Sequence, residues 1–162
     1  MFRTFIFSLI AIFSIFIGSQ LTEGVLLLPY WKSLSAAEFY SYYSRFGPTI
    51  GKFYSILTII AVLIPLVVSI YCYCKKSQAL NYSIVSTFFA VLVIVVFYLY
   101  FKGTNQQFYE ATFNDAQLKF ALKTWGQWHW LRMVFEFLSL IFLIQTFNRL
   151  LQRTELENGV IT

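Results

Sequence analysis

Charged residues are scarce in this chain. Only 12% of its 162 residues are charged, against about 25% in an average soluble domain. The net charge of +5 is dispersed, with a short basic turn at Lys75 and Lys76 and two arginines, Arg149 and Arg153, near the C-terminal end. Nucleic-acid binding needs a clustered basic face. We therefore expect neither a soluble domain nor a nucleic-acid partner.

Histidine and cysteine are also rare, which excludes most metal and haem chemistry. The single histidine, His129, rules out a two-histidine iron site, a three-histidine zinc site and bis-histidine haem within one chain. Cys72 and Cys74 form a Cys-x-Cys pair without the Cys-x-x-Cys redox spacing. A single-chain metal site would need His129 with Glu23 and Glu136. We expect no metal and no cofactor.

Long hydrophobic segments are abundant in the sequence. Hydrophobic residues make up 59% of the chain, and the mean hydropathy is +0.68. A membrane span needs about 20 predominantly apolar residues. Four stretches qualify, at about 4–28, 50–73, 81–101 and 129–150. We predict one all-α domain over 1–162, an integral membrane four-helix bundle surrounded by the lipid bilayer.

The alternation of four spans predicts which connections share a side. The two long connections, about 29–49 and 102–124, lie on one side, and the termini and the 75–80 turn lie on the other. The basic residues of the second group are concentrated in short segments. The positive-inside rule then favours a multi-pass protein with both termini in the cytoplasm.

The first long connection carries a helix-start signal. Ser35-Ala36-Ala37-Glu38 is a capping-box pattern. The four aromatic residues that follow share a helical face: Phe39, Tyr40, Tyr43 and Phe46. Gly47-Pro48 is a typical helix stop. We predict a short interfacial helix that ends there.

The second long connection leads into the last helix. Residues 102–107 form a polar break, and Asn114 is an expected N-cap with Asp115 in the first turn. No proline follows, so a helix over about 115–152 is predicted, roughly 57 Å long at 1.5 Å per residue. It would extend beyond the bilayer. We expect a bend at Gly126 and a kink at Pro65.

The candidate site begins on this last helix. Trp125, His129, Arg132 and Glu136 are spaced i, i+4, i+7 and i+11, so they share one face. Ionisable groups at membrane depth normally face a bundle interior or a water-filled cavity. An aromatic belt with a snorkelling arginine also explains the tryptophans, including Trp128. It does not explain Glu136, which lies about two turns inside the span.

Two further polar residues are expected at the same end of the bundle. Glu23 lies near the end of the first span, beside Gln20 and Gly24 on one helix face. Asn105 follows the third span. We predict a polar network of Glu23, Asn105, His129, Arg132 and Glu136, with Trp125 and Trp128 as aromatic walls. The alternative for Glu23 is an ordinary charge at the membrane interface.

Several short motifs resemble a known family. Pro29 follows the first span, Gly103-Thr104-Asn105 follows the third, and Trp125, His129 and Arg132 open the fourth. This pattern resembles the four-span anthrone oxygenase-like (DUF1772) membrane proteins. The resemblance implies a four-helix membrane bundle and, for some members, cofactor-independent oxygenation of an anthrone to an anthraquinone. Asn105 is followed here by two glutamines, where an apolar residue is usual.

Two functions remain open at this point. The chain is an accessory subunit that packs against other membrane subunits or copies of itself, or it binds an aromatic or lipid-like molecule at the outer end of the bundle. In an oxygenase version His129 is the general base, Arg132 stabilises the oxyanion and Asn105 orients the substrate. Glu136 then holds Arg132 in place. A cavity reaching His129 favours binding, whereas a filled bundle end favours the subunit. A transporter, the third reading, would need oligomerisation.

Overall fold

The fold consists of four long helical rods. The computed structural model describes residues 2–157 and 159, and this part contains no strand. The first rod joins α1 (Phe2–Thr22), the π-helix η1 (Glu23–Leu27) and α2 (Leu28–Ser33); the second is α3 (Ala36–Cys74). The third joins α4 (Leu80–Val96), the π-helix η2 (Phe97–Phe101) and α5 (Lys102–Tyr109), and the fourth is α6 (Asp115–Glu157).

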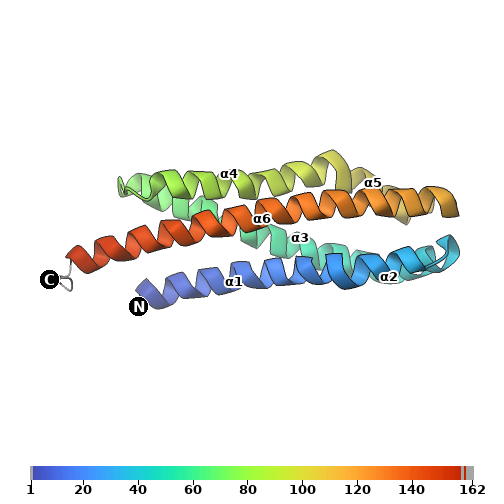
Figure 1. Ribbon diagram of the computed structural model, residues 1–162, viewed down its shortest axis with the longest axis horizontal. Helices are drawn as coiled ribbons and strands as arrows, with labels where there is room; N and C mark the ends of the chain where they lie inside the picture. Colours follow the sequence, from blue (N-terminus) through green and yellow to red (C-terminus); the bar gives the residue numbers. More distant parts are fainter. Residues whose placement is uncertain (1, 158, 160–162) are drawn as a thin grey trace.

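The rods form the predicted all-α bundle. Each is long and apolar enough to cross a membrane. The start of α1 and the end of α6 lie at the same end of the molecule as the turn between α3 and α4 (Figure 1). The connections from α2 to α3 and from α5 to α6 lie at the opposite end (Figure 1). We call these the terminal end and the site end. Which of them faces the cytoplasm stays a prediction.

The predicted interfacial helix is not a separate element. Its capping box is present, with Ser35 and Glu38 bonded in both directions, but the helix does not stop at Gly47-Pro48. It continues as α3 through Pro48 and Pro65 to Cys74. Proline removes one backbone hydrogen bond, and aromatic packing against α5 offsets that loss: the rings of Phe39 and Tyr43 lie 5.2 and 5.5 Å from the ring of Phe108. Packing across elements is not visible in the local stop signal.

The other predicted breaks are also helical. Pro29 occupies the first turn of α2, where a missing N–H is tolerated, so it does not close the first span. The polar stretch predicted as a break forms α5. Asn114 caps α6 as expected, since its Oδ1 accepts from the Gln117 N–H at 3.0 Å. From Asp115, α6 runs unbroken through Gly126 for 43 residues, about 65 Å.

The site end is braced by contacts between its two connections. The Ala36 N–H donates to Asp115 Oδ1 at 2.6 Å. The Tyr40 hydroxyl donates to the Phe113 carbonyl at 2.9 Å. Leu28 on α2 also lies close against α6, because a Cβ on Gly126 would be 2.7 Å from its Cδ2. These contacts fix the four rods around the polar residues described next.

Candidate functional site

Arg132 is the centre of the polar network at the site end. It lies on α6 and is 7% exposed. Its Nη2 donates to Gln20 Oε1 at 2.5 Å and to Glu23 Oε2 at 3.1 Å. The same nitrogen lies 3.0 Å from His129 Nδ1. Since Nη2 carries only two hydrogens, the three acceptors share them.

The first rod supplies two of these partners from the turn where it changes helix type. Gln20 and Glu23 are both buried, at 0% and 4% exposure, and Glu23 begins η1. Gly24 provides the space beside them: a Cβ there would lie 2.8 Å from His129 Nε2. A second π-helix, η2, ends at the buried Phe101. π-helical turns occur frequently at functional sites, and both of these flank Arg132.

His129 is held inside the network with both ring nitrogens engaged. Its Nδ1 faces a guanidinium nitrogen, which only donates, so Nδ1 is the acceptor. Nε2 then carries the proton and donates to the Gln20 carbonyl at 3.0 Å. This assignment makes the ring neutral, so its 3.6 Å approach to Glu23 is not an ion pair. Trp125 stacks on the ring, with centroids 5.2 Å apart and planes 10° apart.

Glu136 lies on the inner side of Arg132. It is 1% exposed, and its Oε1 is 3.8 Å from Arg132 Nε. Neither carboxyl oxygen has a hydrogen-bond partner, and neither has Arg132 Nε. The Phe101 ring covers the guanidinium at 4.6 Å. The cluster therefore places two carboxyl groups around one guanidinium in a buried setting.

A cavity of about 450 Å³ opens beside this cluster. Its polar base contains Glu23 and Arg132, and Asn105 also lines it. The Asn105 Oδ1 accepts from the Trp125 indole N–H at 3.1 Å. The walls are aromatic, formed by Trp31, Tyr43, Tyr54, Phe97, Phe101 and Trp125. Size and lining are those of a small-molecule pocket, apolar with a few polar groups.

The predicted site residues thus divide into two groups. Glu23, Asn105, Trp125 and Arg132 line the cavity, whereas His129 and Glu136 contact Arg132 and do not line it. The cavity therefore reaches Arg132 but not His129. Trp128 does neither: it is half-buried and stacks on Tyr100 at 5.3 Å.

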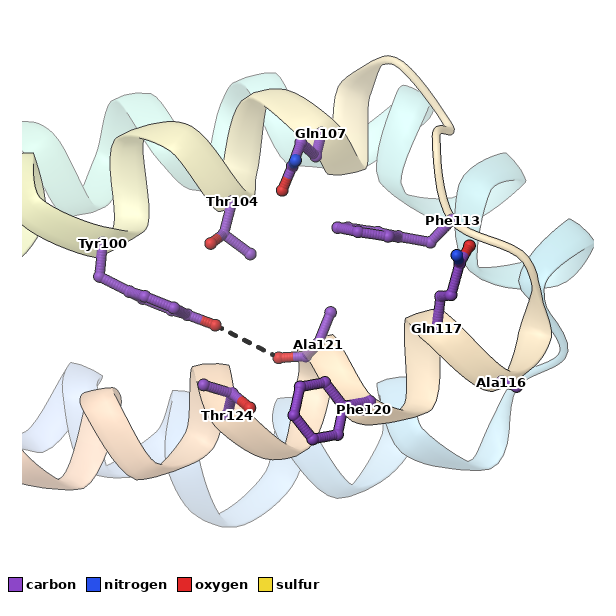
Figure 2. A pocket seen from close by; sticks show the side chains of 9 residues that line it. All are labelled: Tyr100, Thr104, Gln107, Phe113, Ala116, Gln117, Phe120, Ala121 and Thr124. Carbon is purple, nitrogen blue, oxygen red and sulfur yellow. Dashed lines mark hydrogen bonds between the residues drawn. The ribbon is translucent and has the colours of Figure 1, made fainter.

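A second hollow, of about 540 Å³, lies between α5 and the start of α6 (Figure 2). Tyr100 forms one side of it and donates to the Ala121 carbonyl at 3.5 Å. The polar side chains on its walls are neutral, namely those of Tyr100, Thr104, Gln107, Gln117 and Thr124 (Figure 2). The charged cluster lines the other cavity, which is why we take that one as the candidate site.

Sequence reasoning missed most of the aromatic wall. Trp31 and Tyr43 carry no polar-in-membrane signal, and their positions depend on how α2 and α3 pack. The Trp31 indole N–H is buried without a partner. Gln20 was placed on the right helix face, but its carbonyl contact with His129 could not be read from spacing.

The geometry also bears on metal binding. Arg132 occupies the position between Glu23 and Glu136 where a shared cation would have to lie. In the described part of the chain, no group of three His, Cys, Asp or Glu side chains is arranged to hold a metal ion.

Comparisons of the chain with protein-family models, curated proteins and solved structures found no match. The likeness to anthrone oxygenase-like proteins is thus a prediction from short motifs alone. Function has to be argued from the cavity and its polar base.

Proposed function

We propose that the chain is a membrane protein that binds a small amphipathic molecule, aromatic or lipid-like, in the cavity at the site end. The observation that carries this proposal is the ion pair of Arg132 and Glu23 at the base of an otherwise largely aromatic cavity. Charged side chains at membrane depth are costly and usually belong to functional sites. A network that only fixed helix register would be closed by its neighbours on all sides.

The position of the opening supports entry from the lipid phase. The exposed lining residues belong to α3 on one side and to η2 and α5 on the other. Ile59 and Tyr98 are 57% and 64% exposed within apolar helix segments. Lys102, one turn beyond Tyr98, is exposed at the polar rim. Such a mouth suits a molecule with an apolar body in the bilayer and a polar group that reaches the base.

Cofactor-independent oxygenation is a second candidate, because three residues matched by the family motif line the cavity: Asn105, Trp125 and Arg132. His129 gives this version less support, since both its nitrogens are engaged away from the cavity. The base would have to be Glu23, the carboxylate on the cavity wall. Conversion of an anthrone and O₂ to the anthraquinone and water by the purified protein, lost in Glu23→Gln, is the result that this version requires.

The binding proposal is tested by purifying the protein from its native membrane in lipid nanodiscs. Mass spectrometry should identify a small molecule at close to one copy per chain. A stoichiometric partner chain and no small molecule would instead establish the accessory-subunit function.

A variant pair makes the test specific to the cavity. Gly51 lines the cavity, and a Cβ there meets only the Tyr109 hydroxyl at 3.6 Å. We expect Gly51→Phe to fill the mouth and lose the molecule. Gly103 has open space around it and does not line the cavity, so Gly103→Phe should retain it. Equal retention by both variants would contradict binding at this cavity.

A further inference from the structure

The cavity offers an unusual set of unpaired polar atoms. In the described residues, Arg132 forms its hydrogen bonds through Nη2 and Glu23 accepts through Oε2. Arg132 Nη1 and Glu23 Oε1 are left without a hydrogen bond, one a donor and the other an acceptor. They belong to the two residues joined by the 3.1 Å contact, and both residues line the cavity.

Further free donors line the same space. Asn105 must turn Oδ1 toward Trp125, because an indole N–H only donates, so its amide N–H₂ group has no partner. Trp31 also lines the cavity, but its unpaired Nε1 is buried and is not one of these donors. Lys102 adds a positive charge at the mouth, 5.4 Å from the centre of the Tyr98 ring. At the polar base and the mouth, the unpaired donors on Arg132, Asn105 and Lys102 therefore outnumber the one free carboxylate oxygen, Glu23 Oε1.

This set discriminates between polar headgroups. A protonated amine donates but does not accept, so it leaves Arg132 and the other donors unpaired. An alcohol offers one oxygen to several donors. A carboxyl group has two oxygens for Arg132 and Asn105, and the proton of the acid form lies between it and Glu23 Oε1. Because that proton is shared, binding adds no net charge to the buried cluster, which limits the penalty of bringing a carboxyl group beside a carboxylate.

We propose that the bound molecule is a lipophilic carboxylic acid whose carboxyl group pairs with Arg132 and Glu23. This inference rests on the proposed function and narrows it to one headgroup. The apolar body of the acid lies along the aromatic walls and passes between α3 and η2 into the bilayer. Lys102 attracts the headgroup as it enters.

The test compares three probes with the same chain: dodecanoic acid, dodecan-1-ol and dodecylamine, each at equal mole fraction in phosphatidylcholine nanodiscs. Trp31 and Trp125 line the cavity and report binding by fluorescence. A Trp128→Phe, Trp130→Phe background removes the other two tryptophans. We expect the acid to bind about tenfold more tightly than either other probe, the effect of roughly one charge-assisted hydrogen bond.

Variants assign the preference to the site. Arg132→Gln should abolish it, and Lys102→Gln, an exposed position that leaves the bundle intact, should weaken acid binding about threefold without changing alcohol binding. Lys119, also exposed but away from the cavity, provides the matched control: Lys119→Gln should leave acid binding unchanged. Equal effects of Lys102→Gln and Lys119→Gln would overturn the role of Lys102 and count against the assigned site.

The outcomes distinguish a failure of the carboxylic-acid inference from a failure of the proposed binding function. Equal or tighter binding of the alcohol or the amine would overturn the carboxyl inference and leave amphiphile binding standing. If no probe binds but a natural molecule co-purifies and is lost in Gly51→Phe, the inference fails and the function stands. If no probe binds and no molecule co-purifies, both fail.

Discussion

The two ends of the bundle treat buried polar groups in opposite ways. In the terminal half of the bundle, one turn beyond Glu136 along α6, the Ser86 and Ser139 hydroxyls each donate to the carbonyl of the other residue, at 2.8 and 3.0 Å. At the site end lie all the buried side-chain atoms that lack a partner in the described part, on Gln20, Trp31, Arg132 and Glu136. Buried polar groups are normally satisfied. The terminal half therefore satisfies its buried hydroxyls by a contact between two helices, whereas the site end leaves buried polar atoms unpaired beside the cavity.

One groove at the terminal end and the site-end cavity differ in the same direction. The terminal end has an apolar groove of about 330 Å³ between α1 and α3, lined by residues such as Phe5, Ile64 and Phe147 and by no charged side chain. Lipid chains suffice to fill it. The site-end cavity is of similar size but has Glu23 and Arg132 at its base. Charge, rather than volume, distinguishes the proposed binding site from this apolar groove.

The largest effect on this contrast is expected from Arg132→Leu. The substitution leaves Glu23 and Glu136 buried without a compensating charge, and breaking a buried pair in this way costs about 3–5 kcal/mol. The free energy of unfolding in mixed micelles should fall by that amount. Removing both charges of the contact with Glu23→Leu and Arg132→Leu together should recover part of the loss. If the free energy of unfolding is unchanged in Arg132→Leu, the charge of Arg132 does not stabilise the folded protein.

Gly24→Ala should have a smaller effect with a clear sign. The added Cβ would be 2.8 Å from His129 Nε2, where the ring donates to Gln20, so the histidine must move. Overpacking of this kind costs about 1–3 kcal/mol, and ligand occupancy should fall with it.

Gly18→Ala is the control on the same rod, because Gly18 has nothing within 4 Å of an added Cβ. A helical glycine replaced by alanine there should stabilise by roughly 0.5–1 kcal/mol. Equal effects at the two glycines, measured by thermal unfolding, would show that His129 is not held where the geometry puts it.

The location of the polar cluster could be predicted because it depends on local rules. Helical spacing places His129, Arg132 and Glu136 on one face, and alternating spans bring Glu23 to the same end. The structure joins these residues through the Arg132 side chain. Capping signals likewise located the starts of α3 and α6. Each of these inferences uses residues within a few turns of one another or a count of spans.

The cavity could not be predicted, because it depends on how whole helices are placed. Figure 1 shows α3 crossing the bundle, beside α4 at the terminal end and near α2 at the site end. That course requires a helix that continues through Pro48, which the local stop signal argued against. The orientation of His129 away from the cavity has the same origin, since it is set by the Gln20 carbonyl on another rod.

The smallest loss of stability is expected from Ser86→Ala, which tests the contact between α4 and α6 instead of the polar cluster. Ser86→Ala removes one of the two reciprocal bonds between α4 and α6 and leaves the Ser86 carbonyl bonded to Ser139. The loss should be about 1 kcal/mol, visible as a small decrease in unfolding free energy. Because Ser86 does not line the site-end cavity, ligand occupancy by mass spectrometry should stay at the wild-type level. A loss of ligand in this variant would show that the two ends are coupled, so that the contact between α4 and α6 helps to shape the cavity.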